Sequence, residues 1–217
     1  MITDGAEELP ESLATNAKDS FLFDEALIAL QKYSLIEVED EKLSIHRLVQ
    51  AVIRHAMNEE AVKLWAGVAV HVVNVSFPLE SDDVRTWPQC LPLISHASTT
   101  LSHAETIQFT SDKTVRLLNQ LGVYLYARAE YEQARRMYER AIAVDEVTLD
   151  PDHPDVAIRL NNLGSVLREQ GDLEGAKALF ERALHIFREF LGDDHPNTKT
   201  VQGNLHILEQ EMKNAEH

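Results

Sequence analysis

An internal repeat of 42 residues constrains the fold of this 217-residue chain more than any other feature of its sequence. When the sequence is shifted by 42 positions, Asn119–Pro154 aligns without a gap on Asn161–Pro196, and 13 of the 36 aligned residues are identical. A repeat of this length indicates units that cannot each bury their apolar side alone and therefore stack on one another. We therefore expect the second half of the chain to be a stack of similar units.

Each unit is expected to contain two amphipathic helices, because apolar residues recur at three- and four-residue spacing in two successive rows. Small residues such as Gly122 and Ala141 allow the two helices to approach closely, and Gly171 suits the turn between them in the second unit. The repeated Asp-His-Pro triplets at 152–154 and 194–196 are typical of a loop followed by the first turn of a helix. The second half is thus predicted to be built of helix pairs.

Three short segments look like those of the kinesin-light-chain variant of the tetratricopeptide repeat: "LNNLG" at 160–164, "LFERAL" at 179–184 and "LGDDHP" at 191–196. The resemblance covers about Thr114–Lys213. It implies an α-solenoid in which the first helix of each unit lines an inner, concave wall, and a final helix that caps the stack with a polar outer face.

The stretch Asp24–Met57 has a different pattern, which predicts a helix, two short strands around a polar turn at 39–42, and a second helix. Its segment "ALIALQKYSLIEVEDEKLSIHRLVQAVIR", 26–54, resembles the winged helix that follows the nucleotide-binding module in NB-ARC-type (STAND) signal-transduction ATPases. Bacterial members of that family often continue into tetratricopeptide repeats. The segment "WPQCLPLISHA", 87–97, looks like the helical linker placed between the two.

The expected fold is therefore mainly all-α, with one β-hairpin. We expect a partial winged helix at 1–57, a helical linker at 58–112 and repeats at 113–217, divided into 113–154, 155–196 and a capping helix at 197–213. No G-x-x-x-x-G-K-[ST] phosphate loop occurs in the sequence. By the resemblance, this chain is the C-terminal part of a bacterial NB-ARC-type ATPase whose phosphate loop lies upstream of Met1.

Charge and composition narrow the function classes. The net charge of −16 argues against a nucleic-acid partner, because phosphate neutralisation requires clustered Lys and Arg. No apolar run approaches the length of a membrane span. Cys90 is the only cysteine, which favours a reducing compartment and a cytoplasmic protein. We expect neither nucleic-acid nor membrane binding.

The sequence also gives no pattern for catalysis, a metal or another cofactor. Its ten histidines show no metal-ligand spacing, and His153 and His195 are expected to lie in loops or cap helices. His46 is expected to stabilise the junction between a strand and a helix. No G-x-S-x-G nucleophile motif is present, so the chain is not expected to be an enzyme.

The candidate partner-binding residues are polar residues that the repeat pattern puts on the first helix of each unit: Arg116, Asn119, Gln120, Tyr126, Asn161, Asn162, Arg168 and Asn204. Asparagine is a poor helix former, and its amide can both donate to and accept from a peptide backbone. Asn119 and Asn161 have an alternative role, in which they bond neighbouring helices and hold the stack together. The two arginines suit an acidic partner segment.

These observations predict a scaffold that binds a protein or peptide segment in the concave groove of the repeats. By resemblance it is the sensor or partner-recognition end of a signal-transduction ATPase. Two alternatives remain open, a free-standing tetratricopeptide adaptor and a winged-helix transcription regulator. The regulator is disfavoured because residues 8–45 offer only three lysines to DNA.

Overall fold

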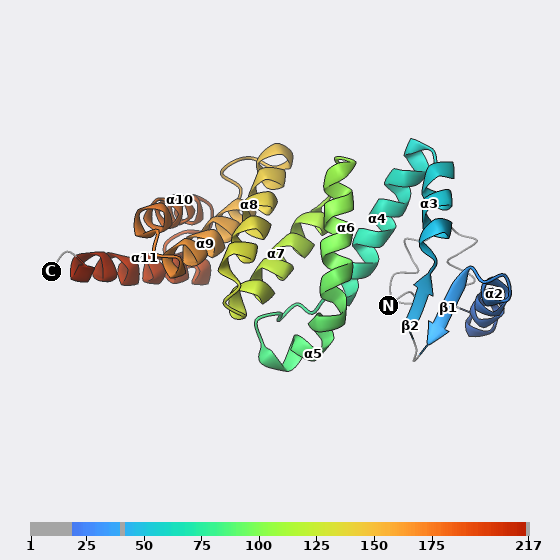
Figure 1. The fold of residues 1–217 in the computed structure, drawn as a ribbon. Helices are drawn as coiled ribbons and strands as arrows, with labels where there is room; N and C mark the ends of the chain where they lie inside the picture. Colours follow the sequence, from blue (N-terminus) through green and yellow to red (C-terminus); the bar gives the residue numbers. More distant parts are fainter. Residues whose placement is uncertain (1–18, 40–41, 216–217) are drawn as a thin grey trace. The chain divides into compact units, whose positions relative to one another are not determined.

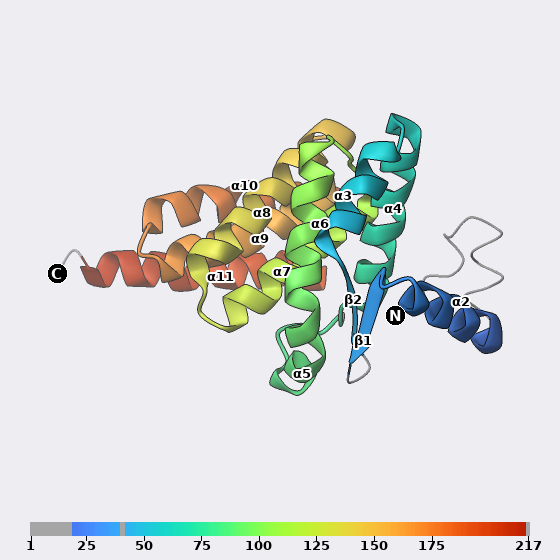
Figure 2. The same ribbon diagram turned by 45° about the vertical axis from the view of Figure 1, so that its right-hand side comes forward.

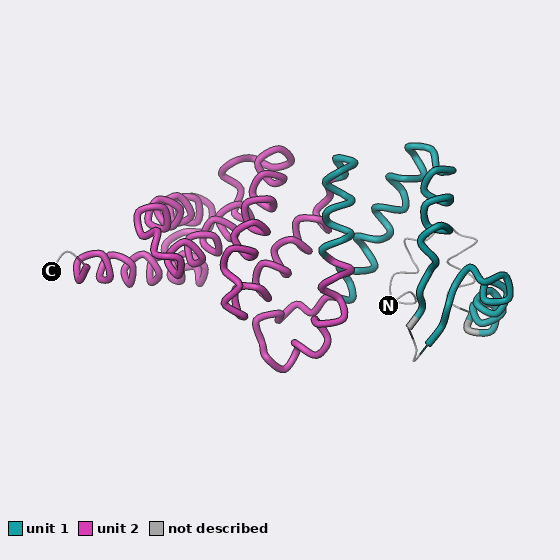
Figure 3. The backbone as a smooth tube through the Cα atoms, viewed as in Figure 1, with its two compact units in different colours: residues 1–76, 98–109 teal, residues 77–97, 110–217 magenta. Residues whose placement is uncertain are grey.

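The computed structural model describes residues 19–39 and 42–215 and divides the chain into two compact units. Unit 1 comprises residues 1–76 and 98–109, and unit 2 comprises residues 77–97 and 110–217 (Figure 3). The described residues are mainly helical, with a single two-stranded sheet. This confirms the predicted fold class.

Unit 1 begins with helix α2, Ser20–Lys32, which Asp19 caps by accepting hydrogen bonds from two backbone N–H groups of the first turn. Strands β1, Ile36–Glu39, and β2, Lys42–Ile45, pair antiparallel and lead from α2 toward the next helix (Figure 2). The hairpin therefore forms where the sequence predicted it. The tip of its predicted turn, residues 40–41, lies outside the described residues.

Three further helices contribute to unit 1: α3, Arg47–Ala56, α4, Glu59–Ser76, and most of α6, Ile94–Thr106. Val70 of α4 and Leu101 of α6 are fully buried, whereas none of the side chains of α3 is buried. His46 caps α3, because its Nδ1 accepts a hydrogen bond from the backbone N–H of Leu48 at 3.2 Å. The predicted local role of His46 is confirmed.

Unit 2 consists of a short N-terminal segment and five long helices. The segment, Phe77–Ala97, contains helix α5, Trp87–Cys90, between 3₁₀ turns at Val84–Thr86 and Leu91–Leu93. The long helices are α7, Asp112–Ala127, α8, Tyr131–Thr148, α9, Pro154–Glu169, α10, Leu173–Leu191, and α11, Pro196–Ala215.

The five helices stack in chain order (Figure 1). Each packs on the next one, and the first helices α7, α9 and α11 also contact one another in sequence. The two helices of a pair approach closely at a glycine. A β-carbon on Gly122 would lie 2.7 Å from the ring of Tyr138, and one on Gly164 would lie 2.8 Å from the ring of Phe180. The predicted role of the small residues in close helix packing is confirmed.

The turns inside the two pairs share one backbone conformation. Gly171 has φ +84° and its equivalent, Ala129, has φ +59°, so both residues lie in the left-handed region. That conformation is accessible to glycine but strained for alanine. Gly171 thus ends its helix as predicted. The same turn forms in the first unit although Ala129 is strained in that conformation.

Helix α11 differs from the other first helices on the side where a second helix would pack. Gln202 and His206 are exposed and Glu209 is half-buried, at the positions that Leu160, Gly164 and Leu167 occupy in α9. Gly164 of α9 leaves room for the Phe180 ring of the second helix, whereas His206 carries a side chain at that position of α11. At these three positions, helix α11 therefore lacks the residues on which α9 packs its second helix.

Candidate partner-binding surface

A ladder of side-chain amides links the first helices of unit 2. The Asn162 amide donates from Nδ2 to Oδ1 of Asn119 at 3.2 Å, and the Asn204 amide donates to Oδ1 of Asn161 at 2.9 Å. Each bond joins a first helix to the one before it, and all four side chains are half-buried. The stack-holding role of these asparagines is therefore present in the structure.

Each rung leaves part of its amides unused by the described residues. Asn162 and Asn204 donate through Nδ2 and keep Oδ1, whereas Asn119 and Asn161 accept through Oδ1 and keep Nδ2. An extended peptide backbone carries donors and acceptors in alternation, which these remaining groups match. Holding the stack and contacting a partner are thus compatible roles for the same residues.

Gln120 occupies the equivalent ladder position in α7, but its partner is different. Its Nε2 donates to the backbone carbonyl oxygen of Leu79 at 2.8 Å, and the Ser81 hydroxyl donates to the Gln120 backbone oxygen at 2.9 Å. Gln120 is only 8% exposed. Because its side chain is buried and satisfied, we remove Gln120 from the candidate surface.

The segment Phe77–Ala97 covers α7 much as a preceding helix would. The ring of Tyr124, which is fully buried, meets Phe77 at 6.5 Å and Trp87 at 5.9 Å between ring centroids. The Arg128 guanidinium lies 5.6 Å from the centroids of both Trp87 and Tyr124. The sequence does not predict this association, because the segment lies outside the 42-residue repeat. Its aromatic and proline residues are the only signal in the sequence that sets it apart from the flanking helices.

Three of the remaining candidates lie near the ends of the first helices. Tyr126, at the end of α7, contacts the Tyr131 ring with 5.7 Å between centroids and lies near Glu169. Arg168, the equivalent of Tyr126 in α9, forms an ion pair with Glu169 at 2.8 Å. Arg116 lies half-buried on α7 and has a partner of its own. The structure thus brings Tyr126 and Arg168 together and gives both cations a partner.

The electrostatics of this cluster follow from burial and from Glu169. Burial, and after it the Glu169 carboxylate, raises the pKa of the Tyr126 hydroxyl. The hydrogen bond that Arg168 donates to Glu169 is the main cause that raises the pKa of Arg168. An acidic partner would therefore have to share that cation with Glu169.

The repeated histidines act as helix caps. Nδ1 of His153 accepts from the backbone N–H of Asp155 at 3.1 Å, and Nδ1 of His195 accepts from that of Asn197 at 3.2 Å. This confirms their prediction as capping residues. Among the described residues, no three His, Cys, Asp or Glu side chains gather as metal ligands would. Nor does any helix in the described part of the chain have the length and apolar character needed to cross a bilayer.

Comparison with known families identifies both ends of the chain. The family described as tetratricopeptide repeat matches residues 113–187 and again 158–217. Residues 1–62 match a family described as a domain of unknown function, DUF7779.

Two related proteins extend this comparison. A nucleotide-binding leucine-rich repeat (NLR)-like protein of Hyaloscypha variabilis (strain UAMH 11265 / GT02V1 / F) is 30% identical over 138 residues. That alignment covers 61% of this chain and 14% of the relative, so this chain corresponds to a small part of that protein. The crystal structure of BtubC (BKLC) from P. vanneervenii superposes with a TM-score of 0.52 at 17% identity, covering 75% of this chain and 61% of that one.

These matches agree with the helix pairs, the close glycine contacts and the 42-residue period of unit 2. The structural likeness supports the solenoid fold, and the NLR-like relative fits the resemblance to NB-ARC-type ATPases. Residues 113–217 of this chain therefore carry tetratricopeptide repeats.

Proposed function

We propose that the chain is the partner-recognition part of an NB-ARC-type signal-transduction ATPase, and that it binds a segment of another protein through its repeats. Tetratricopeptide repeats are a protein-interaction scaffold, and the NLR-like relative supports such a role. The order of the chain, with the DUF7779 match before the repeats, agrees with the order expected from the resemblance.

The proposed binding surface is the row of half-buried polar and aromatic residues on α7, α9 and α11: Arg116, Asn119, Tyr126, Asn161, Asn162, Arg168 and Asn204. The observation that carries this assignment is the amide ladder, which joins each first helix to the one before it and keeps unused donors and acceptors. A row of such groups fits an extended segment better than it fits a compact ligand.

The exposed apolar side chains of unit 1 support the ATPase part of the proposal. Phe21 and Ile28 of α2 are 68% and 63% exposed, and Leu48 and Val52 of α3 are 66% and 60% exposed. Apolar faces of this kind are usually covered by another domain or another protein. In a signal-transduction ATPase the nucleotide-binding module would supply that cover.

The remaining parts of the proposal concern chemistry and location. We assign no catalytic residue and no cofactor to this chain, because its recognisable part is a repeat scaffold. We place it in the cytoplasm, where Cys90, which is buried and free, would remain reduced. Burial raises the pKa of the Cys90 thiol, which further lowers its reactivity.

The proposed surface is tested with the intact chain as bait for proteins from its own cells. Tyr126→Ala removes an aromatic side chain from the surface, and Phe190→Ala is the matched control, since Phe190 lies on α10 and is 57% exposed. We expect Tyr126→Ala to lose the captured partner and Phe190→Ala to retain it. Thermal melting of both variants separates lost binding from lost folding. If Tyr126→Ala, still folded, captures the same partner as the wild type, the surface is wrongly assigned.

A further inference from the structure

The charges around Tyr126 and Arg168 indicate what kind of partner segment this surface accepts. Arg168 is the cation of the first helices that acts on Tyr126, and it is already paired with Glu169 at 2.8 Å. The equivalent positions are Tyr126 in α7 and Gln210 in α11, so the cation is not repeated. The acid next to it is repeated, as Glu169 in α9 and Glu211 in α11.

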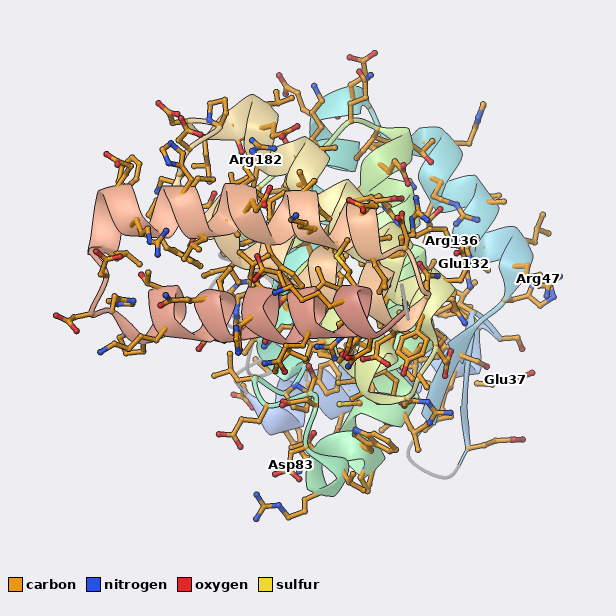
Figure 4. All side chains as sticks on the ribbon, turned by 90° about the vertical axis from the view of Figure 1, so that its left-hand side faces the viewer. Glu37, Arg47, Asp83, Glu132, Arg136 and Arg182 are labelled. Atoms are coloured by element: carbon orange, nitrogen blue, oxygen red, sulfur yellow. The ribbon has the colours of Figure 1, made fainter. Side chains whose placement is uncertain are left out.

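Neighbouring groups add to the acidic character of this cluster. Glu211 lies close enough to Arg168 to raise the pKa of its guanidinium, and it is exposed. The Gln170 amide donates to the Glu132 carboxylate at 3.3 Å, which brings a third acid to the same end of the helices. Two cations of α8 lie beside these acids: Arg136, one helical turn after Glu132 (Figure 4), and Arg135, which lies near Glu132 but is paired with Glu139 at 2.7 Å.

The backbone ends of the helices also add negative charge to this cluster. Tyr126 lies in the last turn of α7, and Arg168 and Glu169 lie in the last turn of α9. Helix C-termini carry a partial negative charge, which favours cations and disfavours acids. A partner carboxylate would therefore meet two helix ends, a paired arginine and several acids.

The rings of Tyr126 and Tyr131 can bind a cation together with the neighbouring acids. The rings of Tyr126 and Tyr131 are half-buried and 5.7 Å apart. An arginine or lysine side chain can lie on such rings while its charged end meets a carboxylate. We propose that the repeat surface takes a basic segment, with an arginine or lysine side chain on Tyr126 and Tyr131 and its charge beside Glu169 and Glu211. This inference rests on the proposed binding surface. It replaces the acidic partner segment that the two arginines alone suggested.

The test uses two fluorescent peptides of equal length, one in which arginine alternates with glycine and serine, and one with glutamate in place of each arginine. Binding to the intact chain is followed by fluorescence anisotropy at low and at physiological salt. We expect the arginine peptide to bind more tightly, and salt to weaken it.

Because the chain as a whole is acidic, the decisive comparison is between two double variants with the same charge change. Glu169→Gln with Glu211→Gln alters the surface, and Glu174→Gln with Glu181→Gln alters exposed positions on α10. We expect the surface pair to raise the Kd of the arginine peptide about tenfold and the α10 pair to change it less than about threefold. Equal losses in both, no binding of the arginine peptide, or tighter binding of the glutamate peptide would overturn the inference.

The results distinguish a failure of the proposed binding surface from a failure of its preference for a basic segment. If Tyr126→Ala loses the cellular partner while Glu169→Gln with Glu211→Gln binds that partner more tightly, the surface is correct and its preference for a basic segment is wrong. If both variants weaken that partner and the α10 pair does not, both proposals are supported.

Discussion

Asp145 of α8 and Arg159 of α9 form an ion pair across the junction between the two repeats, with 3.0 Å between Oδ2 and Nε. Their side chains are 4% and 11% exposed, and the two atoms lack the alignment of a hydrogen bond. At the next junction the equivalent residues are Phe187 and Val201, both 1% exposed. The duplication has thus produced an ionic and an apolar version of the same contact.

We expect the apolar version to be the more stable one. Removing two charges from water costs more than an imperfectly aligned pair regains, so Asp145→Phe with Arg159→Val should stabilise the chain by about 1 kcal/mol or more. Asp145→Phe alone should destabilise it by about 3 kcal/mol, because Arg159 would lose its buried counterion and keep only the more distant, exposed carboxylate of Asp155 at 3.9 Å. Urea unfolding of the two variants measures both effects. A double variant less stable than Asp145→Phe would contradict the prediction.

The same carboxylate predicts a dependence of stability on pH. Burial raises the pKa of Asp145, and this outweighs the opposing effect of Arg159. A folded-state pKa above the unfolded one means that the charged carboxylate costs stability at neutral pH. That cost disappears as the pH falls through the folded-state pKa toward about 4, the unfolded value.

We therefore expect the stability of the wild type relative to Asp145→Asn to improve between pH 7 and pH 4. Unfolding of both proteins at each pH gives this difference directly. The nearby Asp155, His153 and Asp112 are present in both proteins, so their own titration largely cancels. A difference that stays constant or moves in the other direction would show that the Arg159 attraction dominates.

The amide ladder predicts different costs at its rungs. Gln120→Ala should cost about 2 kcal/mol, because it leaves the Leu79 carbonyl without its donor at a site that is 8% exposed. Asn162→Ala should cost about 1 kcal/mol, because both partners of that rung are half-buried and water can replace the lost group.

Hydrogen exchange distinguishes the two variants further. Gln120→Ala should speed exchange in Phe77–Ala97, and Asn162→Ala should leave that segment unchanged. Equal exchange in both variants would mean that the Gln120 amide does not hold the segment against α7.

The two left-handed turns form a matched pair for substitution. Ala129→Gly should stabilise the chain by about 1 kcal/mol, and Gly171→Ala should destabilise it by about the same amount, because alanine is strained at positive φ. No heavy atom lies within 4 Å of a β-carbon placed on Gly171, so a steric clash does not complicate that variant. Thermal unfolding checks both, and effects of the same sign would refute this account.

The sequence predicted the elements well where one pattern repeats. The 42-residue period located the helix pairs, and its small residues predicted a close approach of the helices, which the structure shows between Gly122 and Tyr138. A period identifies equivalent positions, but it does not say which atoms meet. It therefore left two roles open for Asn161, and it could not show that Glu169 pairs with Arg168.

The other misses have physical reasons of the same kind. Gln120 looked like an exposed ladder residue because its equivalents are asparagines, yet a non-repeating segment covers it. Only tertiary packing reveals that cover. The Asp145–Arg159 pair was detectable, since Asp145 aligns with Phe187 and a carboxylate at an apolar position signals a buried partner.

The polar side of α11 has a consequence for how such an array changes length. With Gln202, His206 and Glu209 in place of the Leu160, Gly164 and Leu167 of α9, helix α11 cannot bind a second helix by the contacts that α9 makes with α10. On α7, the side-chain amide of Gln120 already donates its hydrogen bond to the Leu79 carbonyl. A copy of residues 155–196 inserted between the existing units would instead meet asparagines on both sides. A new unit therefore reproduces the existing contacts when it is inserted between the two repeats.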